Sequence, residues 1–198
     1  MNSTTDTHLG HAGWRWSLPN GDSVFVAEQG AHVLSWQAGG RERLYLSPAS
    51  VPDGSTAIRG GIPVCFPQFN QRGTLPKHGF ARNMAWTAGE AVTRGEGAYI
   101  DFTLSTNVDT LAIWQQAFVA QFRVAIQSGE LTVTLTVINT EVHHELHFTA
   151  ALHTYLAVDD IDLTELRGLG GCPEWDAVAD VHGVADDALY FDGEFDRV

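Results

Sequence analysis

The segment LTVTLTVI, residues 131–138, is the clearest secondary-structure signal in the sequence. Aliphatic side chains alternate along it with threonine hydroxyls at 132, 134 and 136. A period of two places the aliphatic side chains on one face of a strand and the hydroxyls on the other. Branched residues also favour extended backbone. The segment therefore predicts a β-strand with one buried face.

Segments of similar character occur on both sides of this strand. Further strands are expected at 24–34 (a pair broken at Gln29-Gly30), 44–46, 84–93, 97–105, 116–126, 146–158, 161–167 and 188–192. The intervening TNVDTLAIW is a loop or one turn of helix, and no helical periodicity is longer. Many short strands separated by turn signals predict an all-β fold, an antiparallel β-sandwich.

Length and composition set the domain organisation that we expect. The chain has 198 residues, of which 44% are hydrophobic, enough to bury a sizeable core. Residues 1–12 are polar and lack periodicity, so they are expected to be a flexible lead-in. Residues 13–198 contain no repeat or visible boundary, and we expect them to form a single domain.

The charge and the cysteines exclude several classes of protein. A formal net charge of −13 argues against binding to nucleic acid or to an anionic membrane. Cys65 and Cys172 form neither a CxxC motif nor a disulfide framework. The first residues lack a basic start followed by an apolar run, and no stretch of 18 apolar residues occurs. We therefore expect a cytoplasmic location.

The stretch RGGIPVCFPQFNQRGTLPKHGFAR, residues 59–82, has an unusual charge for this acidic chain. It contains no Asp or Glu but four of the eleven basic residues, Arg59, Arg72, Lys77 and Arg82. Its prolines and glycines predict a fixed, irregular loop. A local positive field in an acidic protein indicates a site for a small anion such as phosphate or carboxylate. The alternative is an ordinary solvated connection.

Two of the nine histidines are candidates for proton transfer. His78 lies within the basic stretch, and His153 lies in the apolar segment 146–158 on the same face as Tyr155. A histidine in an apolar strand must find a partner or face a cavity. The pair would suit acid–base chemistry near neutral pH. A core histidine bonded to a backbone carbonyl is the alternative for His153.

A histidine-rich cluster and one cysteine can each be interpreted either as a functional site or as an ordinary structural feature. His143, Glu145 and His147 share one face of a strand, which would suit a metal in a cupin-like enzyme. A solvated hairpin rim is the favoured reading of this cluster. Cys65 is read as a small buried hydrophobe in preference to a nucleophile.

Three longer motifs resemble a known family. IRGGIPVCFPQF at 58–69, HGFAR at 78–82 and ALHTYL at 151–156 resemble the hexose-6-phosphate mutarotases, the glucose-6-phosphate 1-epimerase family of the aldose 1-epimerase group. Shorter segments agree with it: GAHVLSW at 30–36, LYLSP at 44–48, VINT at 137–140 and GEFDRV at 193–198. The resemblance implies a galactose-mutarotase-like β-supersandwich.

The resemblance also implies an activity and roles for individual residues. It implies an isomerase that exchanges the α and β anomers of a hexose 6-phosphate by acid–base ring opening, without metal or cofactor. By the match of motifs, His153 is the general acid, and His78 binds and polarises near the ring oxygen. Arg59 and Arg82 match the arginines that hold the phosphate. Gln68 and Asp196 match contacts to sugar hydroxyls.

The sequence departs from the family in three respects. The family's general base is a glutamate on a later strand, and no residue here matches it; the final strands of the sandwich are missing too. Lys77 stands where the family has a neutral residue. We therefore expect a fragment of a longer protein or a shortened relative, and a non-catalytic sugar-phosphate-binding module is the alternative function. The choice among glucose, galactose and mannose 6-phosphates stays open.

Overall fold

The computed structural model describes residues 4–54, 56–192 and 197. They form two compact units, Met1–Ala157 and Val158–Val198. The sequence had shown no boundary between them, and each unit is described separately. None of the helices in the described ranges is both long and apolar enough to cross a bilayer.

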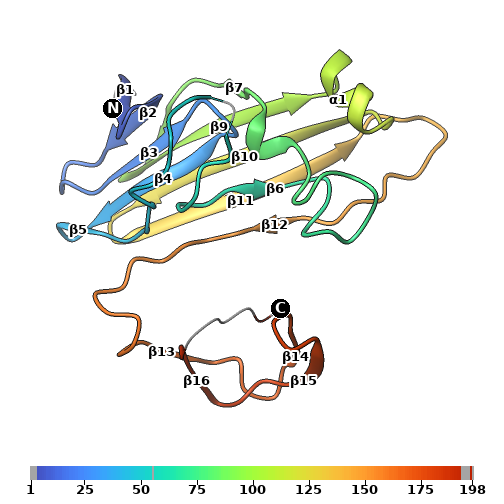
Figure 1. Ribbon diagram of the computed structural model, residues 1–198. Helices are drawn as coiled ribbons and strands as arrows, with labels where there is room; N and C mark the ends of the chain where they lie inside the picture. Colours follow the sequence, from blue (N-terminus) through green and yellow to red (C-terminus); the bar gives the residue numbers. More distant parts are fainter. Residues whose placement is uncertain (1–3, 55, 193–196, 198) are drawn as a thin grey trace. The chain divides into compact units, whose positions relative to one another are not determined.

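The strand predicted from LTVTLTVI is present as β11 (Glu130–Asn139). It pairs antiparallel with β10 (Phe118–Gln127) along its whole length, and β10 pairs with β9 (Gly97–Ser105). Two short strands, β7 (Thr87–Ala88) and β8 (Val92–Arg94), pair with the other side of β9. Figure 1 shows β9, β10 and β11 as the long strands of this sheet. Alternate residues of β9 and β10 are buried, as a sheet with one solvated face requires.

A second antiparallel sheet contains the strands of the N-terminal part in chain order. Its members are β1 (Thr4–His8), β2 (His11–Ser17), β3 (Ser23–Ala27), β4 (His32–Ala38) and β5 (Arg41–Glu42). Residues 4–8 differ from the expected flexible lead-in because they pair with β2. An exposed edge strand is held by backbone hydrogen bonds and needs no apolar pattern, so its sequence gave no signal.

The two sheets bury one common core. Trp16, Val24 and Val33 come from the first sheet, and Phe102 and Phe122 come from the second. The Trp14 and Phe102 rings meet between the sheets, with centroids 5.4 Å apart. Face-to-face packing of two antiparallel sheets confirms the predicted β-sandwich class.

The connection from β9 to β10 contains the helix α1 (Val108–Ile113). The Asn107 side chain accepts hydrogen bonds from the backbone N–H groups of Asp109 and Thr110, which caps the first turn. Of the two structures that the sequence allows here, a loop or one turn of helix, the short helix is the one present.

The prediction of one long strand at 146–158 is wrong. Only β12 (Ala151–Leu152) is regular strand, paired with β6 (Val64–Cys65) inside the basic stretch. The flanking residues still run alongside: Thr149 N–H donates to Pro67 O and Tyr155 N–H to Gly61 O. Proline lacks an N–H group, so Pro63 and Pro67 interrupt the ladder on both sides of β6. The predicted strand at 44–46 is likewise reduced to single bridges.

In its described residues, the regular structure of the second unit consists of two small antiparallel strand pairs. β13 (Glu165–Arg167) pairs with β16 (Ala188–Tyr190), and β14 (Pro173–Asp176) pairs with β15 (Val181–Val184). The sequence predicted the first pair and missed the second. Arg197 lies 2.7 Å from Asp176 and 3.7 Å from Glu174, which ties residue 197 to β14.

Candidate active site

A cavity of about 310 Å³ in the first unit brings the basic stretch and the strand histidine together. Three segments contribute its walls: one before and within β6, one that leads into the 3₁₀ turn η1 (Ala81–Asn83) and includes part of it, and one directly after β12. Its lining residues are Ala57, Ile58, Arg59, Pro63, Cys65, Lys77, His78, Arg82, His153 and Tyr155. The volume suits a ligand of monosaccharide size.

The backbone that carries Arg59 is held from both sides. Arg59 O accepts a hydrogen bond from Ser47 N–H at 2.9 Å, and Gly61 N–H donates to Tyr45 O at 2.7 Å. Gly60 has φ +116°, and a Cβ there would collide with Tyr45 O. Only glycine fits this position, so Arg59 projects from a rigid anchor.

A buried histidine fixes the same anchor from beneath. His32 in β4 is 1% exposed, and its Nε2 lies 2.7 Å from Gly60 O, to which it donates. Burial lowers the pKa of His32 to about 4, against the opposing effect of the Gly60 hydrogen bond. His32 therefore stays neutral at physiological pH. Sequence reasoning missed it, although a histidine in the apolar segment GAHVLSW was a visible signal.

Arg82 lies within η1, and its backbone packs against Gly30 in the turn between β3 and β4. Its Nη2 donates to Lys77 O at 3.2 Å, and Trp86 Nε1 donates to Ala81 O at 2.9 Å. A Cβ at Gly30 would collide with the Arg82 backbone, so glycine allows this close approach. In the described part of the chain the buried Nε of Arg82 has no hydrogen-bond partner.

The rings of the two candidate histidines lie next to each other in the lining of the cavity. The His78 and His153 ring centroids are 5.9 Å apart, and the rings are nearly perpendicular at 86°. Asn70 N–H donates to His78 Nδ1 at 3.3 Å, so the neutral ring carries its proton on Nε2. His153 stacks on Tyr155 at 4.9 Å. The spacing of residues 153 and 155 on one face was the sequence signal for this second aromatic ring.

The cavity walls are positively charged. Arg59, Lys77 and Arg82 line the cavity, and none of its lining residues is an acid. Among the described residues these three cations form no ion pair, whereas Arg15 pairs with Asp6 and Arg123 with Asp101. Cations that lack carboxylate partners in a chain of net charge −13 indicate an anion site.

The other predicted site residues lie elsewhere. Gln68 is buried and does not line the cavity; its amide bonds to Asn70 O and to both backbone groups of Leu75. These bonds hold the 70–75 loop. Asp196 lies outside the described residues. Cys65 lines the cavity, and burial raises the pKa of its thiol, which keeps it protonated.

The histidine cluster before β12 does not form a metal site in the described chain. No group of three or more potential ligands is close enough there to hold an ion. His147 lies 3.3 Å from Glu145, and both side chains are more than 80% exposed. The arrangement is that of a solvated rim.

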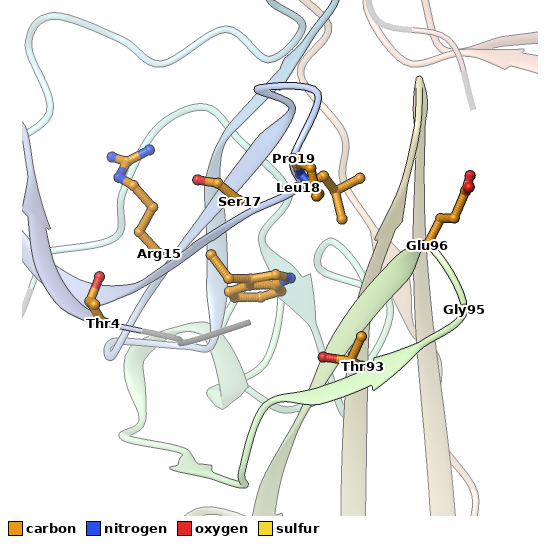
Figure 2. Close-up of a pocket in the computed structure, with 9 residues that line it drawn as sticks. Thr4, Arg15, Ser17, Leu18, Pro19, Thr93, Gly95 and Glu96 are labelled. Atoms are coloured by element: carbon orange, nitrogen blue, oxygen red, sulfur yellow. The ribbon is translucent and has the colours of Figure 1, made fainter.

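A larger cavity of about 530 Å³ does not offer the same chemistry. Figure 2 shows Arg15 and Thr4 on one side of it, with Thr93 and Glu96 across from them. The Arg15 charge is already compensated by Asp6 at 2.5 Å, and Glu96 adds a negative charge. No histidine lines this cavity in the described chain, so it lacks both the anion site and the proton-transfer groups.

Comparison with known proteins gives consistent results. The model of the family described as aldose 1-epimerase matches residues 14–193. A protein of Escherichia coli named "Putative glucose-6-phosphate 1-epimerase" is 41% identical over 150 residues, 73% of this chain and 48% of that protein. A Cenchrus ciliaris protein with the same name is 35% identical over 179 residues, 85% of this chain and 54% of that protein.

A solved structure extends the likeness to three dimensions. The crystal structure titled as that of "a putative mutarotase (YeaD)" from Salmonella typhimurium superposes with a TM-score of 0.86 at 30% identity. It covers 99% of this chain and 65% of the other. The chain spans about half the length of the curated relatives that it matches.

Proposed function

Because the chain belongs to the aldose 1-epimerase family, we propose that it interconverts the α and β anomers of a hexose 6-phosphate. The observation that carries the proposal is that two imidazole rings, 5.9 Å apart, share one sugar-sized cavity with three cations for which the described residues provide no carboxylate partner. The relatives named for glucose-6-phosphate epimerisation support this substrate class. A cytoplasmic location stays a prediction.

In this proposal the phosphate binds to the guanidinium groups of Arg59 and Arg82. The Arg82 guanidinium is already held by its hydrogen bond to Lys77 O, so little of its side-chain entropy is lost on binding, whereas the exposed Arg59 side chain extends from a fixed backbone. Guanidinium forks match phosphate oxygens in pairs, and such charge-assisted bonds are about twice as strong as neutral ones. The sugar ring then extends toward the two histidines.

The reaction moves one proton to the ring oxygen and removes one from the C1 hydroxyl while the C1–O5 bond breaks. His153 donates a proton to the ring oxygen as the C1–O5 bond breaks. The C1 hydroxyl gives its proton to a base, and the C1 carbonyl forms. Rotation about C1–C2 followed by the reverse transfers closes the ring with the other configuration. His78, with its proton on Nε2, polarises the ring oxygen by a hydrogen bond. Each of the two proton transfers, to the ring oxygen and from the C1 hydroxyl, is worth about 10²–10⁴-fold.

The base is the open part of the proposal. No carboxylate lines the cavity among the described residues, and no residue of the sequence matches the family's glutamate. This observation favours one alternative, a module that binds sugar phosphate without turnover. The two functions share the anion site and differ only in catalysis.

Exchange NMR on glucose 6-phosphate labelled with ¹³C at C1 separates the two functions. Cross-peaks between the α and β signals report the exchange rate directly. The proposal expects exchange that rises in proportion to protein concentration. Binding without acceleration over buffer would establish the alternative, and absence of both would remove the proposed function.

A further inference from the structure

We propose that Lys77 is a specificity-determining residue that selects a doubly charged phosphate monoester over singly charged esters of the same shape. The inference rests on the proposed function, because it concerns the same cavity. Lys77 is the only lysine of the chain and one of the three cations that line the cavity. Neither the motif resemblance nor the comparisons assign it a role.

The backbone around Lys77 is tightly held. Gly79 N–H donates to Pro76 O at 2.8 Å, and His78 N–H donates to Asn70 O at 3.0 Å. His78 itself has φ +67°, a left-handed conformation that turns the chain just after the lysine. The ammonium group is therefore attached to a fixed point at the cavity, although the side chain itself is exposed.

Lys77 and Arg82 belong to the same wall. Arg82 Nη2 donates to Lys77 O at 3.2 Å, which joins the phosphate-binding guanidinium to the lysine backbone. Arg59 comes from the separate segment before β6. An anion held by the two arginines would lie within the field of the ammonium group, since all three residues line one cavity of about 310 Å³.

The three cations would read different properties of an anion. The arginine forks read the arrangement of oxygen atoms, which a phosphate ester shares with a sulfate ester. An ammonium group is a compact point charge without a fixed geometry, so its contribution follows the total charge of the ligand. Because the phosphate monoester carries nearly two charges above its second pKa of about 6, Lys77 would favour it over the singly charged sulfate.

A matched pair of ligands tests this directly. The affinities of glucose 6-phosphate and glucose 6-sulfate are measured by calorimetry at pH 7.5 and low salt. Lys77→Met should weaken phosphate binding about 3- to 10-fold and sulfate binding only by about the square root of that factor, roughly 2- to 3-fold, because the sulfate carries about half the charge. Lys77→Arg should retain most of the preference. Arg41→Met removes the same charge from exposed β5, outside the cavity, and should leave both affinities unchanged.

The single lysine also allows a direct readout. Reductive ¹³C-methylation labels Lys77 and the terminal amine, so two signals are expected. Glucose 6-phosphate should shift the Lys77 signal more than glucose 6-sulfate at equal saturation. Equal loss of both affinities in Lys77→Met, or no loss of either, would overturn the inference. Wild-type protein that binds neither ester would overturn the proposed function as well, whereas an unchanged preference for phosphate in Lys77→Met, with intact catalysis, would remove the role of Lys77 alone.

Discussion

The β9–β11 sheet and the cavity differ in how their charged side chains are compensated: the sheet pairs an arginine with an acid, whereas the cavity is lined by cations and, among the described residues, by no acid. In the sheet, Arg123 binds both oxygens of Asp101 at 2.7 Å and lies 4.1 Å above the Tyr99 ring. Around the cavity, Arg59, Lys77 and Arg82 share one space with no carboxylate among the lining residues. Like charges held together without compensation destabilise a fold. The sheet is thus arranged for stability, and the cavity holds charges that a ligand would compensate.

The largest effect is expected at the cavity and on turnover alone. His153→Ala removes the proposed general acid, so anomer exchange should fall about 10²- to 10⁴-fold. The side chain is only half-buried, and the melting temperature should change little. Exchange NMR and a thermal melt measure the two quantities. His143→Ala, an exposed histidine outside the cavity, is the matched control and should keep the wild-type rate.

In the sheet, a core substitution is expected to lower stability and to leave ligand affinity unchanged. Phe102 is fully buried in β9 against Trp14, so Phe102→Ala should lower the free energy of unfolding by about 3–5 kcal/mol. Urea denaturation measures the loss. The folded fraction at low temperature should bind glucose 6-phosphate as the wild type does. A large loss of affinity in that folded fraction would contradict the separation of the two regions.

His32, in β4 of the other sheet, supports the cavity through Gly60, and its effect on stability should appear in acid. Its pKa is lowered to about 4 in the folded chain from an ordinary value of 6.5, so the unfolded chain takes up the proton first. The stabilising effect of the neutral ring is present above pH 6.5 and is lost as the pH falls toward 4. The loss amounts to as much as about 3 kcal/mol.

His32→Gln tests this by keeping a donor for Gly60 O without a titrating group. Urea denaturation at pH 7, 5.5 and 4.5 should show a smaller acid loss in the variant than in the wild type. Burial also lowers the pKa of His11, which adds to the acid loss in both proteins. Identical pH dependence in the two proteins would exclude His32 as the source.

The smallest effects come from a matched pair of arginines. Arg82→Met should weaken glucose 6-phosphate binding about 10- to 100-fold, because a guanidinium–phosphate pair in a cavity is lost. Arg123→Met removes an exposed ion pair and should lower stability by no more than about 1 kcal/mol, with unchanged affinity. Calorimetry and urea denaturation cover both variants. Equal affinities in the two variants would mean that the unpaired charges do not bind the ligand.

The regular sheet was predictable because its signals are local. The alternation in 131–138 and the run at 97–105 each specify a strand without reference to any partner. The run at 146–158 failed because its partner segment contains Pro63 and Pro67, a fact that no inspection of 146–158 reveals. The sequence did not predict strand β1, because an exposed edge strand needs few apolar residues and therefore has no alternating pattern.

The site was predictable in composition but not in detail. The absence of acids from 59–82 indicated an anion site, and the motif resemblance selected His78 and His153, which do line one cavity. The role of His32 depends on its distance to Gly60 O, and the use of the Gln68 amide depends on the fold of its own loop. Such contacts join residues whose proximity only the folded chain creates.

The hairpin of β10 and β11 has a consequence for the order of folding. Its ten residue pairs are joined by the short turn at Ser128 and Gly129, so the two strands can meet after a brief local search. The cavity instead needs Gly61 beside Tyr155 and Pro63 beside His153, and these contacts close a very long loop. During refolding the hairpin should therefore gain amide-exchange protection early, and the capacity to bind an anion should be the last property to appear.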